Sequence, residues 1–218
     1  MAIKIQDGLV SLHLPKLMPL WLAKQFVARK QPWIHNKLQH YQQRPPKRQF
    51  TQGELQPFLG TLYPLNLIYS DSRQASLQFD QHSFTLLAPE GIRQQEIYER
   101  FICWYRQQAE VLLTERAQQL SQQTGLIPGN IQIKRYKSRW GSCNIRGDIQ
   151  LNWQLIQAPW HIIDYVIIHE LCHLQQHNHS PTFWDLVGKF DPDYPSHRVW
   201  LKQHGHQLVL QTPKDHIL

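Results

Sequence analysis

The chain has 218 residues, 41 % of them hydrophobic, with eight Trp, eight Tyr and eight Phe, so it can bury a core and is not disordered over most of its length. No run of about 18 apolar residues occurs, which excludes a membrane-spanning helix, and the first 20 residues lack the pattern of a signal peptide. Three widely spaced cysteines argue against a disulfide framework and predict a reducing, cytoplasmic environment.

The formal net charge of +7 is unevenly distributed along the sequence. Residues 8–53 contain eight Lys or Arg and no acidic residue. A second basic run comprises Lys134, Arg135, Lys137, Arg139 and Arg146. Either run is explained by a soluble basic surface, or by attraction to nucleic acid or to a small anionic substrate.

Residues 1–90 are expected to form a small β-rich subdomain with a basic first segment. Apolar spacing from Leu20 to Tyr41 is typical of a helix, and residues 44–48 (Arg-Pro-Pro-Lys-Arg) indicate an extended connector. Short apolar runs at 65–69, 75–79 and 83–87 are separated by Gly, Asp and Ser. These runs predict antiparallel strands joined by tight turns.

Residues 91–218 are expected to form the main domain, in one compact unit with the first. Helical spacing covers 92–124 and stops at Gly125. Strands are predicted at 131–136 and 149–153, and a helix from Pro159, since proline fits the first helical turn. The expected fold class is therefore α+β.

The helix that begins at Pro159 contains His169-Glu170-x-x-His173, the HExxH pattern. Residues four apart lie on one face of a helix, so both imidazoles can reach one metal ion at about 2.0–2.1 Å. Glu170 lies beside that face and is placed to activate a metal-bound water without ligating the metal. The alternative is an ordinary amphipathic helix with two exposed histidines.

A catalytic zinc site has a third protein ligand and an open fourth position. No glutamate follows Glu170, so this ligand must be a later His or Asp. On a continuous helix His177 would lie about 12 Å from the first histidine, too far for a compact site. We predict His179, because residues 178–181 (Asn-His-Ser-Pro) end one helix and begin the next, which turns the chain back. Asp185 is an alternative.

Several segments together resemble the YgjP-like metallopeptidase-domain family, which is related to the SprT-like zinc peptidases. They are Arg139-Trp-Gly-Ser-Cys143, Leu151-Asn-Trp153, Asp164-Tyr-Val166, His169-Glu-Leu-Cys-His-Leu174 and Asn178-His-Ser-Pro-x-Phe-Trp184. The resemblance is dense from about 131 to 201 and looser upstream. It implies a zincin-like fold preceded by a small β-rich subdomain. It also implies His169, His173 and His179 as zinc ligands and Glu170 as the catalytic glutamate.

The segment before the second predicted strand adds a candidate catalytic residue. Gly141 would let the backbone approach another element closely, and Arg139 could stabilise an oxyanion or bind an anionic group. A tight turn with a structural role is the alternative. Three further residues near the motif have open roles: Cys143 as a fourth ligand of a structural site, Asp164 as a partner of a ligand histidine, and Tyr194 as an oxyanion donor.

The sequence thus predicts a zinc-dependent hydrolase, foremost a metallopeptidase that acts on a peptide and uses Zn²⁺ with Glu170 as the base. One alternative keeps the zinc and changes the substrate to a nucleotide or another phosphoanhydride. The other is a non-catalytic, zinc-containing module associated with nucleic acid. We expect no membrane partner.

Overall fold

The structure is a computed structural model, and it describes residues 1–6, 9–15, 18–42, 48–71 and 73–210. It divides into two compact units, Met1–Pro46 and Lys47–Leu218, each of which is described by itself. The connector predicted at 44–48 lies outside the described residues except for Arg48. In the described part of the chain, no helix is both long enough and apolar enough to cross a membrane.

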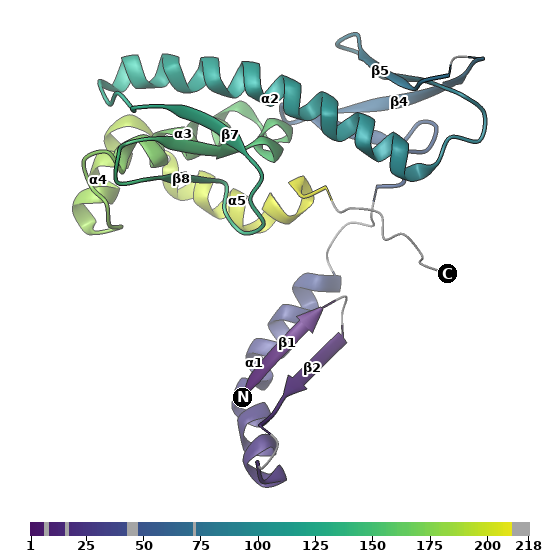
Figure 1. Cartoon of the computed structure of the whole chain (residues 1–218). Helices are drawn as coiled ribbons and strands as arrows, with labels where there is room; N and C mark the ends of the chain where they lie inside the picture. The colour runs from purple at the N-terminus through teal and green to yellow at the C-terminus, as the bar shows by residue number, and fades with distance from the viewer. Residues whose placement is uncertain (7–8, 16–17, 43–47, 72, 211–218) are drawn as a thin grey trace. The chain divides into compact units, whose positions relative to one another are not determined.

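The first unit consists of a hairpin and a helix (Figure 1). Its elements are β1 (Ala2–Gln6), β2 (Leu9–His13) and α1 (Leu20–Gln42). The two strands pair antiparallel, and α1 continues through Pro32. Ala23 is buried, whereas Trp21 and Trp33 are 65 % and 44 % exposed. Helix α1 therefore presents aromatic side chains to solvent among its basic residues.

A four-stranded sheet opens the second unit, in the order β3-β4-β6-β5. Its strands are β3 (Leu55–Phe58), β4 (Thr61–Tyr69), β5 (Ser76–Phe79) and β6 (Phe84–Ala88). The prediction of antiparallel strands was wrong for one pair, because β4 and β6 run parallel. Strand β6 inserts between β4 and β5, so only the β3–β4 and β5–β6 pairs are antiparallel.

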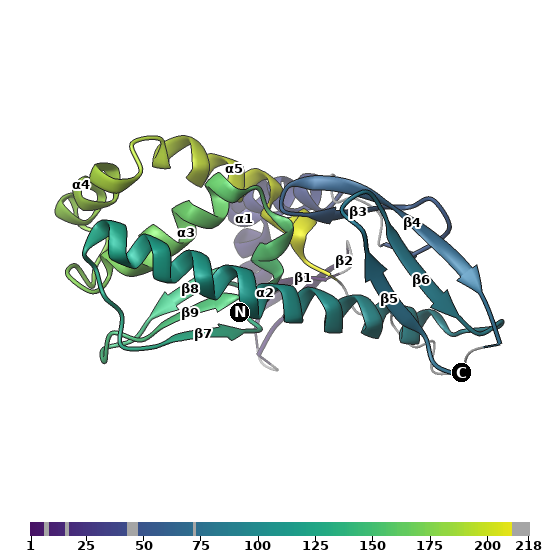
Figure 2. The same cartoon turned by 90° about the horizontal axis from the view of Figure 1, so that it is seen from above.

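Helix α2 (Gln94–Thr124) joins this sheet to the rest of the second unit. Figure 2 shows it running from the four-stranded sheet to a second sheet, and it contacts both. Phe84 of β6 lies with its ring centre 4.9 Å from that of Trp104 and 5.5 Å from that of Phe101. Gly125 ends the helix with a φ of 73°, as its place in the sequence predicted.

The second sheet and the remaining helices follow α2. The sheet has the order β7-β9-β8, and β8 is one of its edges. These elements are β7 (Ile131–Lys134), β8 (Gly141–Cys143), β9 (Ile149–Asn152), the short 3₁₀ helix η1 (Trp153–Gln157), α3 (Trp160–Cys172), α4 (Pro181–Phe190) and α5 (Tyr194–Leu208). Together with α2 they complete a mixed α+β fold.

The division of the chain falls between Pro46 and Lys47, whereas the sequence suggested a boundary near residue 90. The difference has a physical reason: the phenylalanines of the four-stranded sheet pack against α2 and share one hydrophobic core with the C-terminal helices. The β-rich segment and the helical segment therefore belong to the same unit. The separate unit is the basic N-terminal segment.

Candidate metal centre

Helix α3 carries the centre and is held rigidly. Residues on most of its circumference are buried: Ile162, Ile163, Tyr165, Val166, Ile167, Ile168, Leu171 and Cys172. Asp164 accepts two hydrogen bonds of 2.7 Å from Arg116 of α2. Asp164 was a candidate partner of a ligand histidine, but its carboxylate instead forms an ion pair with Arg116 that fastens α3 to α2. Sequence spacing alone could not reveal this partner, which lies 48 residues away.

Three imidazoles meet at the C-terminal end of α3. His169, His173 and His179 each offer a ring nitrogen, and these atoms lie within 4.8 Å of one another. Nε2 of His169 and Nε2 of His179 are 3.0 Å apart. In a tetrahedral zinc site with bonds of about 2.0–2.1 Å, ligand nitrogens are separated by roughly 3.3 Å. The cluster therefore offers three imidazole nitrogens to one metal ion, and the His169–His179 pair lies close to the spacing of a tetrahedral zinc site.

The chain reversal that brings His179 to the other two histidines occurs after α3. Backbone bonds from the amides of Gln175 and Gln176 to the carbonyl of Cys172 form the turn. The amide of Ser180 then donates to the side chain of Asn178 at 3.3 Å, and α4 begins at Pro181. Helix α4 thus begins at the predicted residue, whereas α3 ends at Cys172, before residues 178–181, and Asn178 does not take the left-handed conformation.

Phe183 and Trp184 of α4 pack against the three imidazoles. The ring centre of Phe183, which is fully buried, lies 4.9, 4.6 and 4.8 Å from those of His169, His173 and His179. Trp184 stacks on His179 at 5.6 Å and on Tyr194 at 5.3 Å. Tyr194, considered as an oxyanion donor, is thus part of an aromatic stack that supports His179.

Two of the histidines are held in the neutral form that binds metals. Burial lowers the pKa of His169 to about 3, and the neighbouring positive groups add to the shift. Burial also lowers the pKa of His173, whose Nδ1 lies 2.9 Å from the carbonyl oxygen of Gln176. Donation from Nδ1–H to that carbonyl leaves the lone pair of Nε2 free for a metal. Nδ1 of His169 is buried without a hydrogen-bond partner.

Glu170 is a buried carboxylate beside the histidines, with 5 % of its surface exposed. Burial raises its pKa to about 8, and the positive charge of Arg139 opposes the shift. The backbone of β8 passes directly against it. A Cβ atom on Gly141 would lie 2.5 Å from Oε1 and 2.6 Å from Cγ of Glu170. The close approach expected at Gly141 is present, and its partner is the candidate base.

A cavity of about 370 Å³ adjoins the three histidines and Glu170. It is lined by Arg139, Gly141, Ser142, Cys143, His169, Glu170, His173, His177 and His179. The structure thus brings all five predicted site residues to one cavity. Cys143 and His177 line it too, but among the described residues the metal-binding group comprises only the three histidines. Asp185 is exposed and lies outside that group.

Three imidazoles beside a buried carboxylate form the kind of site that metal-dependent hydrolases use. The family model of the YgjP-like metallopeptidase domain matches residues 1–204, and the chain belongs to this family. Membership of a metallopeptidase family implies that the chain is a hydrolase.

Comparison with curated proteins gave no match. Among solved structures, the chain is similar to the metallopeptidase zymogen of Pyrococcus abyssi abylysin, with 21 % sequence identity and a TM-score of 0.36. That likeness covers 42 % of this chain and 94 % of the abylysin chain.

Proposed function

We propose that this chain is a zinc-dependent peptidase in which His169, His173 and His179 hold the metal and Glu170 is the general base. The observation that carries the proposal is the group of three imidazole ligand atoms within 4.8 Å, next to one buried carboxylate. Imidazole nitrogens are preferred zinc ligands, and three protein ligands are typical of a catalytic site. The peptidase activity is supported by the family to which the chain belongs.

Zinc at this centre would polarise the scissile carbonyl and lower the pKa of water towards about 7. His169 and His179 would hold the zinc ion through Nε2, and His173 would hold it through the Nε2 that its Nδ1 contact leaves free. Phe183 excludes water from beneath the imidazoles, because it is fully buried against all three rings.

Glu170 handles the proton in this proposal. Its carboxylate accepts a proton from the attacking water and delivers it to the leaving nitrogen. Burial raises its pKa to about 8, so it is a stronger base than an exposed glutamate. A cation bound by the histidines favours its ionised form, which keeps the base available at neutral pH. The backbone at Gly141 packs closely against this carboxylate.

Arg139 provides positive charge at the rim of the same cavity. Its guanidinium lies 5.3 Å from the centre of the Tyr136 ring. From there it can pair with the negative charge that develops on the carbonyl oxygen, or with an anionic group of the substrate. We expect Arg139→Ala to lower kcat/KM while leaving zinc affinity unchanged, because Arg139 is not a ligand.

A second candidate keeps the centre and changes the substrate to a nucleotide or another phosphoanhydride. Arg139 in the cavity and the neighbouring basic run favour it, because guanidinium groups pair well with phosphates. The non-catalytic alternative gains less support, since a structural zinc site has no use for a buried carboxylate such as Glu170.

The test compares zinc-loaded wild-type protein with Glu170→Gln on a panel of unstructured peptides and nucleoside triphosphates. We expect peptide hydrolysis by the wild type and a loss of at least about 10²-fold in the variant at equal zinc content. Hydrolysis of nucleotides alone, with the same loss, would establish the second candidate. Equal hydrolysis by both proteins would remove Glu170 from the mechanism, and loss of zinc from the variant would make it a ligand.

A further inference from the structure

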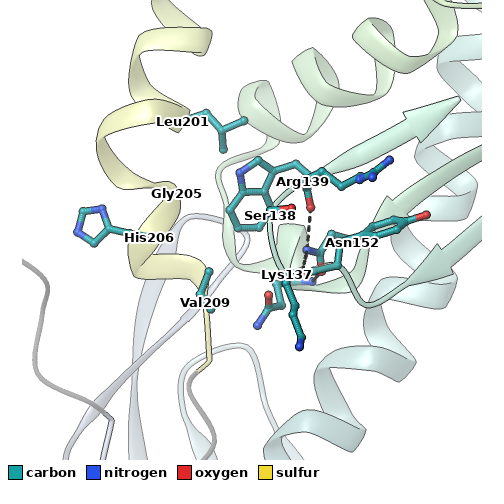
Figure 3. Close-up of a pocket in the computed structure, with 11 residues that line it drawn as sticks. Lys137, Ser138, Arg139, Asn152, Leu201, Gly205, His206 and Val209 are labelled. Atoms are coloured by element: carbon teal, nitrogen blue, oxygen red, sulfur yellow. Dashed lines mark hydrogen bonds between the residues drawn. The ribbon is translucent and has the colours of Figure 1, made fainter. Parts of the chain in front are cut away.

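A second cavity, of about 200 Å³, adjoins the metal centre and shares Arg139 with it. The segment between β7 and β8 forms one wall, and α5 with the residue that follows it forms the other (Figure 3). The lining residues are Tyr136, Lys137, Ser138, Arg139, Trp140, Asn152, Gln154, Leu201, Gly205, His206 and Val209. The function proposed above uses Arg139 alone among them.

Asn152 fixes the wall that carries the basic residues. It is buried, and its side-chain Nδ2 donates to the carbonyls of Tyr136 and Arg139, both at 3.1 Å. Its backbone amide donates to the carbonyl of Trp140 at 2.8 Å. A single side chain thus holds the loop at both ends, so the cavity is preformed.

Trp140 closes the cavity against α5. A Cβ atom on Gly205 would lie 3.2 Å from Cζ2 of the indole, so the absence of a side chain at this position lets the ring approach the helix. Leu201 and Val209 add apolar surface on the same side. This part of the cavity suits the aliphatic or aromatic portion of a ligand.

The charge of the lining is positive. Lys137 contributes to it, whereas the side chain of Arg139 extends away from α5 (Figure 3), and the residues that line the cavity include no Asp or Glu. Carbonyl groups at the end of α5 would repel an anion, but two of them are already paired. The carbonyl of Gln207 accepts a hydrogen bond from Arg48 at 3.0 Å, and that of Leu208 accepts one from Gln157 at 2.8 Å. An anion at this cavity is therefore favoured.

The cavity lies within reach of a peptide bound at the metal centre. Gly141 touches Glu170, and Trp140 and Arg139 precede it directly in the chain. Consecutive Cα atoms are about 3.8 Å apart, so the Cα of Lys137 lies at most about 15 Å from that of Gly141. An extended peptide covers that distance in about four residues, at about 3.3 Å each.

We propose that this cavity is a substrate subsite for a carboxylate, within about four residues of the scissile bond. The carboxylate belongs either to an acidic side chain or to the C-terminus of the peptide. Lys137 pairs with it, while Trp140 and Leu201 pack against the rest of the residue. The proposal rests on the peptidase function proposed above.

Binding is measured by calorimetry on zinc-loaded Glu170→Gln protein, so that no probe is cleaved. The probes are capped alanine-rich pentapeptide amides with one Glu placed at each position in turn, their Gln counterparts, and the same peptides with a free C-terminal carboxylate. We expect one Glu peptide to bind about tenfold more tightly than its Gln counterpart, the size of a charge-assisted hydrogen bond. If the C-terminal carboxylate is the ligand, the free-acid peptide shows that gain instead.

Lys137→Gln should abolish the tenfold preference, whereas Lys134→Gln, an exposed lysine outside the cavity, should leave it intact. Equal binding of all matched peptides, or a preference that survives in Lys137→Gln, would overturn the subsite. The peptidase function is tested separately by wild-type cleavage of the uncharged pentapeptide. Cleavage without a carboxylate preference refutes only the subsite, and a preference without cleavage of any probe refutes the peptidase.

Discussion

Replacing Gly141 with alanine should displace the Glu170 carboxylate without disturbing the three histidines. The added methyl carbon would lie 2.5 Å from Oε1 and 2.6 Å from Cγ, about 1 Å inside the normal contact distance. Forcing a methyl group into a packed site costs about 1–3 kcal/mol of unfolding free energy. A carboxylate moved by about 1 Å from its productive position lowers kcat by about 10²-fold. Zinc content should remain that of the wild type.

Urea unfolding of chelator-treated protein provides the assay, in a cycle of wild type, Gly141→Ala, Glu170→Ala and the double variant. With the Glu170 side chain removed, the clash disappears, so the alanine at position 141 should cost less than about 0.5 kcal/mol. The coupling energy between the two substitutions should then equal most of the penalty of about 1–3 kcal/mol that is expected for Gly141→Ala in the wild-type background. A penalty of the same size in both backgrounds would show that Gly141 does not press on Glu170, and the reasoning would fail.

Four further predictions concern the metal, its support, pH and charge. His179→Ala should weaken zinc binding at least about 100-fold in a chelator competition, and more than His177→Ala does. A larger loss of zinc affinity in His177→Ala than in His179→Ala would overturn the ligand assignment. Trp184→Ala should weaken zinc binding about tenfold, because the indole stacks on His179, and Trp184→Phe should restore the affinity. Unchanged zinc affinity in Trp184→Ala would show that this stack does not help to hold the metal. Burial raises the pKa of Glu170 to about 8, so the folded metal-free protein favours the protonated carboxyl group below that pH. As the pH rises from 5 to 8, the unfolding free energy of the metal-free wild type should fall by about 3 kcal/mol relative to that of Glu170→Gln. Parallel pH profiles of the two proteins would refute this prediction. Replacing four basic residues of α1 with Glu should weaken the binding of single-stranded DNA and reduce its salt dependence; these residues are Lys24, Arg29, Lys30 and Lys37. Unchanged DNA binding and unchanged kinetics would show that the basic run is only a solubilising surface.

The elements near the metal centre could be predicted because their signals are local. Helical spacing over 92–124 corresponds to α2 at Gln94–Thr124, and Pro159 directly precedes α3. The start of α4 at Pro181 follows from the Ser180-Pro181 pair next to His179 in the sequence, whereas the end of α3 at Cys172 was not predicted. The three histidines that the structure brings together were therefore accessible to sequence reasoning, although their role as ligands stays a prediction.

The pairing of strands and of distant side chains could not be predicted in the same way. Apolar runs identified β4, β5 and β6 but do not specify which strand lies between the others, and the parallel β4–β6 pair was missed. Asp164 could be placed near the start of a helix, but nothing local indicates Arg116 as its partner. Gly141 signalled a close approach, and only the fold shows that the approaching group is Glu170.

The measurement that tests the central claim most directly is X-ray absorption at the zinc edge of the zinc-loaded protein. Coordination by His169, His173 and His179 predicts three imidazole nitrogens at about 2.0–2.1 Å, an oxygen as the remaining light scatterer and no sulfur. The imidazole signal should fall in His179→Ala. A sulfur scatterer at about 2.3 Å would identify Cys143, which lines the same cavity, as a ligand. That result would make the centre a closed structural site and contradict the proposed peptidase.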